Sequence, residues 1–208
     1  ILFFAPAFAD EDTEEIIESV TIIGSAEDQR KLPGSGQIIT NDDLLKAMDT
    51  DIQKILSAVP GLYMRTEEGY GLRPNISIRG TAIERSAKVA IMEDGVLVAP
   101  SPYTSSSAYY FPTTGRIHSV EVLKGPAAVS QGPQTIGGAI NLISTPIPNS
   151  PSGKFVQELG ENGMMRTHAY FGGTSGNFGA LLEVHEHESD GFDSIANVGG
   201  DTGFDKSD

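Results

Sequence analysis

Residues 116–145 constrain the fold most, because two β-patterned runs enclose a loop dense in glycine and proline, RIHSVEVLKGPAAVSQGPQTIGGAINLIST. The alternating run 119–123 predicts one strand, a Gly-Pro pair ends it, and 127–131 has room for a single helical turn. A Gly-Gly pair precedes the second strand, 139–143, and its missing side chains allow a positive φ or the close approach of another backbone. The stretch therefore predicts two strands joined by a tight loop.

A hairpin adds two more strands. Residues 88–92 and 96–98 flank Glu93-Asp94-Gly95, and an Asp-Gly pair between alternating runs favours a β-hairpin. A short alternating run, N-I-S-I-R-G at 75–80, is closed by glycine. The economical fold for 40–146 is a small mixed four-stranded sheet.

Residues 40–59 favour two short helices. Thr40 and Asp43 form a capping-box-like start for the first helix, and Asp49 or Thr50 can cap the second. A Pro-Gly pair ends the second helix. The predicted fold class of this part is α+β, with short helices packed on the mixed sheet.

Composition excludes several kinds of site. The chain has 208 residues and no cysteine, so neither disulfides nor thiolate metal sites can form. Its net charge is −14 with only 14 Lys and Arg, which argues against a nucleic-acid partner because phosphate neutralisation needs clustered cations.

From residue 153 onward the pattern changes to long alternating strands. Residues 166–171 and 180–187 alternate apolar with polar side chains, which is typical of outer-membrane barrel strands with apolar residues toward lipid and polar ones toward the lumen. Turns fall at 161–163 and 174–177, and the acidic, Gly-rich stretch 189–208 suits an extracellular loop. We expect 153–208 to hold about three strands of a barrel whose remainder lies beyond Asp208.

The first nine residues, ILFFAPAFA, end in the small-x-small pattern of a signal-peptidase site. The run is far shorter than the roughly 20 residues of a membrane helix. We expect 1–9 to be the remainder of a signal peptide and the mature chain to begin at Asp10.

Several motifs together resemble one family. The runs V-E-V-L-K-G-P, G-G-A-I-N, N-I-S-I-R-G and E-D-G, with the Pro-Gly pair, are similar to those in the plug domain of TonB-dependent outer-membrane receptors. The resemblance implies a plug domain at 37–150 followed by the barrel strands. It also implies an outer-membrane receptor without enzymatic activity. Such a receptor imports a scarce ligand, with a ferric chelate as the favoured one, and carries Fe3+ as cargo with no resident cofactor.

The run E-S-V-T-I-I-G at 18–24 admits two interpretations. A short β-branched run near the start of a domain is most often its first strand. Its position near the mature N-terminus, before the polar stretch 25–36, instead resembles the TonB box, which pairs by strand addition with the periplasmic protein TonB. The residues of the predicted box are Glu18, Ser19, Val20, Thr21, Ile22 and Ile23.

Residues 10–36 would then form a periplasmic tether. From Gly24 to Thr40 the extended chain spans roughly 55 Å, more than a bilayer core of about 30 Å. The box could therefore reach TonB while the plug stays in the membrane.

The candidate ligand contacts rest on resemblance to the ferric-dicitrate branch, carried by M-E-D-G-V-L-V-A-P-S-P-Y and Y-Y-F-P. In that branch the apical loops of the plug face the ligand, which makes Arg65, Arg73, Tyr103 and Tyr109 candidate contacts. The aromatic residues could equally pack on the barrel wall. The family also implies that Arg79, of the I-R-G ending, pairs with carboxylates on the inner barrel wall.

Other interpretations stay open at this point. His185 and His187, with Glu183 beside them, could reach a metal, but lumen-facing polar residues of a barrel strand explain the same pattern. A secreted β-rich adhesin or binding module would explain the composition, and a carbohydrate-active enzyme would need paired carboxylates in a cleft.

Overall fold

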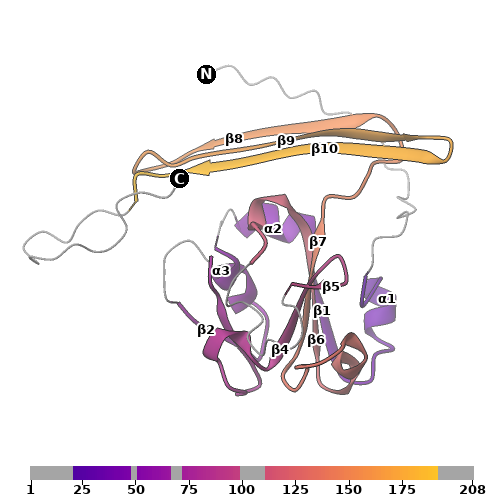
Figure 1. Ribbon diagram of the computed structural model, residues 1–208, viewed down its shortest axis with the longest axis vertical. Coiled ribbons are helices and arrows are strands. Elements are labelled where there is room, and N and C mark those ends of the chain that lie inside the picture. Colours follow the sequence, from indigo (N-terminus) through magenta and orange to yellow (C-terminus); the bar gives the residue numbers. More distant parts are fainter. Residues whose placement is uncertain (1–20, 48–50, 67–71, 99–110, 192–208) are drawn as a thin grey trace, which may run out of the picture.

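The computed structural model describes residues 21–47, 51–66, 72–98 and 111–191. These form a mixed sheet with helices on it and a separate sheet of three long strands, which runs across one end of the first part (Figure 1). None of the helices in these ranges is long and apolar enough to cross a membrane.

The mixed sheet has five strands in the order β1-β6-β7-β4-β5. Its only parallel pair in the described residues is β4 with β7, and the others are antiparallel. The α+β fold class is confirmed, but the sheet has one strand more than the sequence predicts. The strands are β1 (Ser35–Ile39), β4 (Val89–Glu93), β5 (Val96–Leu97), β6 (Ile117–Lys124) and β7 (Gly138–Ser144).

The hairpin of β4 and β5 turns where the sequence predicts it. Asp94 and Gly95 both have positive φ, 48° and 77°, as a two-residue hairpin turn requires. The Asp94 carboxylate then accepts hydrogen bonds from the Ser144 N–H at 3.0 Å and its hydroxyl at 2.7 Å. The turn is thereby fixed to the end of β7.

Gly138 supplies the close backbone approach predicted for the Gly-Gly pair. Its φ is 159°, and a Cβ at this position would lie 2.2 Å from the Leu123 carbonyl oxygen. A side chain is therefore excluded where β7 begins beside the end of β6. The loop between these strands contains the predicted helical turn as η3 (Pro126–Gln131).

One face of the sheet is covered by two helices and a small two-stranded sheet, seen on the left in Figure 1. The first helix has the predicted capping box, because the Thr40 hydroxyl accepts from the Asp43 N–H and the Asp43 carboxylate accepts from the Thr40 N–H. The second is capped by Asp51, which accepts from the Gln53 N–H at 2.8 Å, while Asp49 and Thr50 lie outside the described residues. The elements are α2 (Asn41–Ala47), α3 (Ile52–Ser57), β2 (Leu62–Arg65), β3 (Asn75–Ile78) and the 3-10 turn η1 (Glu84–Ser86).

The opposite face is covered by residues 21–34, including α1 (Ala26–Gln29), and by η3. In this structure the described part of 10–36 is therefore packed on the sheet, and the role of 10–36 as a periplasmic tether stays a prediction. Gly36 explains why this segment can pack on the sheet, because a Cβ there would meet the Leu32 side chain at 2.7 Å and that of Ile23 at 3.1 Å.

The three long strands are β8 (Ser152–Leu159), β9 (Met165–Ser175) and β10 (Phe178–Glu188), paired antiparallel in the order β10-β9-β8. Exposed and half-buried residues alternate along β10 and, from Gly153 onward, along β8, and apolar side chains such as Leu182 are exposed on the outer face (74%). The inward-facing side chains, most of them polar, face the mixed-sheet part and lie next to η2 (Thr114–Arg116) and the start of β6. The three predicted strands, their turns and the direction of their alternation are confirmed.

Candidate functional site

A buried carboxylate lies at the centre of the face covered by the N-terminal segment. Glu121 is on β6, between Ile38 of β1 and Asn141 of β7, and its residue is only 1% exposed. Alternation along β6 places Val120 and Val122 in the hydrophobic cluster on the other face, so Glu121 points toward the N-terminal segment.

Four N–H groups satisfy this carboxylate. Its Oε2 accepts from the Ile22 N–H at 2.6 Å and from the Asn141 side-chain amide at 3.2 Å. Its Oε1 accepts from the N–H groups of Ile23 and Gly24, each at 3.1 Å. A buried charge needs such compensation, and here three of the donors are consecutive main-chain groups of one segment.

The same segment is also held by apolar packing. Ile23 is 6% exposed and lies against a small cluster that includes Met92 and Leu123. Beyond it, the Gln29 amide donates to the Gly36 carbonyl at 2.6 Å, which ties α1 to β1.

The end of the predicted TonB box is thus placed on the mixed sheet. Ile23 is buried and Ile22 is half-buried, so these two residues lie on the folded core in this structure, and the assignment of 18–23 as the TonB box stays a prediction. Glu18, Ser19 and Val20 lie outside the described residues, and Thr21 is half-buried.

The candidate ligand arginines flank one loop on the other side of the sheet. Arg65 ends β2 and pairs in register with Asn75, so Arg65 and Arg73 stand at the two ends of the β2–β3 connection. Both are exposed. The structure brings these two predicted residues together, whereas Tyr103 and Tyr109 lie outside the described residues.

Arg65 already has an anionic partner. Its guanidinium donates two hydrogen bonds to the Glu84 carboxylate, at 2.9 and 2.6 Å. These bonds, and the charge of Arg65, hold the pKa of Glu84 below its ordinary value. A ligand anion at Arg65 would therefore compete with Glu84.

Arg79 lies at the end of the sheet where β7 begins. Its main chain has a φ of 54° and its N–H donates to the Gly61 carbonyl at 2.8 Å. The guanidinium lies over Gly125, where a Cβ would be 3.0 Å from Nη1. Among the described residues no barrel carboxylate forms an ion pair with Arg79, and its contact with the barrel wall stays a prediction.

A second cation accompanies Arg79. The Lys124 ammonium donates to the Pro60 carbonyl at 3.0 Å, and burial, followed by the nearby Arg79 charge, lowers the pKa of Lys124. Two neighbouring cations make this end of the sheet suited to carboxylate partners.

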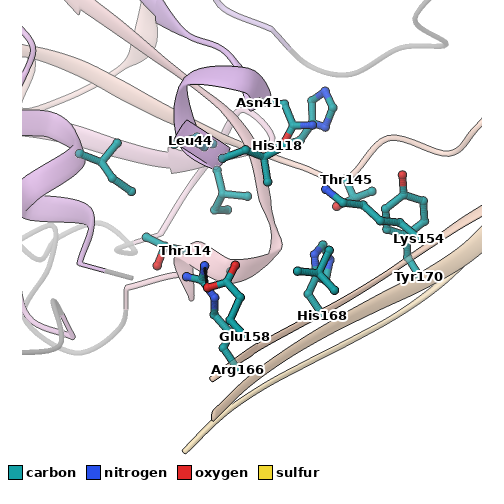
Figure 2. A pocket seen from close by; sticks show the side chains of 15 residues that line it. Asn41, Leu44, Thr114, His118, Thr145, Lys154, Glu158, Arg166, His168 and Tyr170 are labelled. Atoms are coloured by element: carbon teal, nitrogen blue, oxygen red, sulfur yellow. Dashed lines mark hydrogen bonds and ion pairs between the residues drawn. The ribbon is translucent and has the colours of Figure 1, made fainter. Parts of the chain in front are cut away.

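A cavity of about 90 Å³ lies between the mixed-sheet part and the long strands (Figure 2). Glu158 and Arg166 form an ion pair on its wall. His168 lies nearby on β9, and its Nε2 is 2.7 Å from the Glu183 carboxylate, which also accepts from the Thr145 hydroxyl at 2.6 Å. This polar network joins the connection after β7 to the inner face of the long strands.

His185 belongs to the same contact. A Cβ on Gly115 would lie 1.7 Å from His185 Nε2, so the ring occupies the space that the glycine leaves. His185 and His187 both point inward from β10. Within the described ranges no group of three or more His, Cys, Asp or Glu is arranged to hold a metal.

The comparison with known protein families decides what these parts belong to. The model of the TonB-dependent receptor plug domain matches residues 28–139, from α1 into the start of β7. The chain belongs to this family. The mixed sheet with its helices is the plug, and the three long strands are early strands of the receptor's outer-membrane β-barrel. The chain is therefore an outer-membrane protein.

Two curated relatives are similar in sequence. The vitamin B12 transporter BtuB of Photobacterium profundum is 26% identical over 78% of this chain and 29% of its own length. The iron-regulated outer membrane virulence protein of Vibrio cholerae is 30% identical over 69% of this chain and 22% of its own length. The chain thus spans less than a third of the relatives that it matches.

Solved receptors share the fold. The ferric citrate transporter FecA in its unliganded form has a TM-score of 0.68 at 22% identity and covers 85% of this chain, which spans 28% of it. The ferric yersiniabactin receptor FyuA of Yersinia pestis has a TM-score of 0.60 at 22% identity, with coverage of 76% and 24%. At this identity the likeness shows the fold alone.

Sequence reasoning missed Glu121 and Asn141 as a site. The available signal was a charged residue at the centre of an apolar strand, within V-E-V-L, and an amide at the centre of A-I-N-L-I. Such residues are rarely buried without partners, but the partners lie 97 to 99 residues away along the chain.

Proposed function

We propose that this chain is part of a receptor that imports a ferric chelate across the outer membrane, driven by TonB pairing with residues 18–23. The observation that carries the proposal is the separation of two sites by the plug sheet. The end of the predicted box is held on one face, and the loop bearing Arg65 and Arg73 lies beyond the elements on the other. A coupling site and a ligand site on opposite sides of a plug suit directional transport.

Iron is the favoured cargo. FecA is named for ferric citrate and FyuA for ferric yersiniabactin, and the Vibrio cholerae protein is named as iron-regulated. The two loop arginines suit an anionic chelate such as ferric dicitrate. Vitamin B12 is the second candidate, because BtuB matches over most of this chain.

Growth distinguishes the two cargoes. A strain that lacks the gene is tested under iron limitation with ferric dicitrate and other defined ferric chelates, and separately with vitamin B12 as the required supplement. We expect a defect with at least one ferric chelate and none with vitamin B12. The reverse result would assign the receptor to vitamin B12.

A proline substitution, which removes a main-chain N–H, tests the coupling. Strand addition uses backbone N–H and C=O groups, so Val20→Pro removes a donor and Val20→Ala retains it. In the full-length receptor we expect Val20→Pro to abolish uptake while cells bind the chelate with normal affinity, and Val20→Ala to be mild. Normal uptake by the proline variant would show that 18–23 is not the coupling strand.

Position 20 is the sharper choice for this test. At Ile22, proline would also delete the hydrogen bond to Glu121, and uptake could then change for a second reason.

A further inference from the structure

The contact between Glu121 and residues 22–24 is specific to the main chain. Three successive N–H groups converge on the two oxygens of one carboxylate, at 2.6, 3.1 and 3.1 Å. The side chain of Ile23 points into the neighbouring apolar cluster. The site therefore recognises a backbone conformation together with one apolar side chain.

The environment of Glu121 makes this contact strong. Among the described residues no Lys or Arg forms an ion pair with its carboxylate, and Asn141 provides the remaining donor. If the segment left, the buried Glu121 carboxylate would keep only one of its four hydrogen-bond donors, the Asn141 amide. An unsatisfied buried charge costs free energy.

Asn141 links the site to the far edge of the sheet. Its side-chain Nδ2 donates to Glu121, and its side-chain Oδ1 accepts from the Gly95 N–H at 2.9 Å. Because both ends of Asn141 are engaged, its amide cannot rotate to replace the lost donors. The carboxylate is thus dependent on the segment.

We propose that Glu121 is the docking site within the plug for the end of the coupling segment, and that residues 22–24 occupy it when the segment is not extended toward a partner. The consequence for TonB rests on the proposed function: the Ile22 N–H is bound to Glu121, so it is unavailable for a new strand pair until the segment detaches. The three N–H groups leave together, because they share one acceptor.

Amide hydrogen exchange in the full-length receptor, in detergent without ligand or TonB, tests the docking directly. In Glu121→Gln, an amide replaces one acceptor oxygen and opposes the incoming N–H groups. We expect the amides of Ile22, Ile23 and Gly24 to exchange at least about tenfold faster, by a common factor. Protection along β6 and β7 should be retained.

Asp94→Asn is the matched control. It makes the same carboxylate-to-amide change on the same sheet and alters the bonds to Ser144, but it does not touch the segment. Protection at 22–24 should be unchanged in this variant. Unchanged protection at 22–24 in Glu121→Gln, with the strands intact, would overturn the proposal.

A reciprocal change on the segment decides the case if Glu121→Gln disturbs the sheet. Ile22→Pro deletes one donor and Ile22→Ala retains it, while both shorten the apolar contact. We expect faster exchange at Ile23 and Gly24 in the proline variant than in the alanine variant. Equal exchange in the two variants would show that packing alone holds the segment.

Binding of the purified periplasmic domain of TonB separates this inference from the proposed function. If both hold, Glu121→Gln binds that domain more tightly, by a factor similar to the gain in exchange. Faster exchange with unchanged TonB binding would support the docking site and count against coupling through residues 18–23.

Discussion

The two faces of the plug sheet are built differently, although they share the same strands. On one face, in the described part of the chain, the buried cluster consists only of isoleucine, leucine and valine from the sheet, α3 and β2–β3. On the other face half of the buried cluster is alanine, and the centre is occupied by Glu121 and Asn141. Full burial of a large aliphatic side chain contributes about 1.5–3 kcal/mol, so the first face carries most of the hydrophobic stabilisation.

This difference separates a permanent face from a removable one. Side-chain interdigitation on the helix-covered face is lost only when the plug unfolds. On the other face, the segment 21–24 contributes one buried side chain and three main-chain hydrogen bonds to a single residue. Such a segment can leave while the sheet itself remains folded.

The largest expected effect is a difference in stability between two side-chain substitutions, one on each face. Leu56 is fully buried on the helix-covered face, and Leu56→Ala should destabilise the plug by about 2–5 kcal/mol. Ile23→Ala, on the other face, should lower protection only at residues 21–36 and leave β6 and β7 unchanged. Hydrogen exchange in the full-length receptor measures both, and loss of protection throughout the sheet in Ile23→Ala would contradict the idea of a removable face.

The same contrast explains what could be predicted from the sequence. Local signals located the Asp94-Gly95 turn, the Thr40 capping box, the approach at Gly138 and the alternation of β8–β10. Each depends on residues adjacent in the chain or on a period of two along a strand. The motifs around these elements also located the plug.

The removable face was not predicted, because its contacts are not local. β1 reads S-G-Q-I-I, which carries a weak strand signal, and it forms only by pairing with β6 more than 80 residues later. The polar stretch before it reads as a linker until Ile23 and Gly36 are seen in contact. Main-chain bonds to Glu121 leave no side-chain signal at 22–24, since any residue except proline supplies an N–H.

The next effect concerns the β2–β3 loop, which the proposed function assigns to the ligand and which belongs to the permanent face. In the full-length receptor, Arg65→Ala with Arg73→Ala should weaken binding of ferric dicitrate by about tenfold or more, because charge-assisted hydrogen bonds to the anion are lost. The matched control is Arg30→Ala with Lys31→Ala, which removes two exposed cations from the other face. Equal affinity in the two double variants would remove the loop arginines from the ligand site. Amide hydrogen exchange at 22–24 should be unchanged in the variant that lacks Arg65 and Arg73.

The smallest effect comes from the partner of Arg65. Glu84 neutralises the Arg65 guanidinium through two hydrogen bonds, so Glu84→Gln should raise affinity for ferric dicitrate by a few-fold, roughly the strength of an exposed ion pair. The gain should shrink as salt rises, because exposed charges are screened over about 10 Å at 0.1 M. The lowered pKa of Glu84 fixes the sign of the pH dependence: the pair stabilises the loop above the ordinary carboxyl pKa and ceases to do so as pH falls through the lowered value. Binding isotherms for the wild type and Glu84→Gln at two salt concentrations provide the test. A loss of affinity in Glu84→Gln would show that Glu84 orients Arg65 for the ligand and does not compete with it.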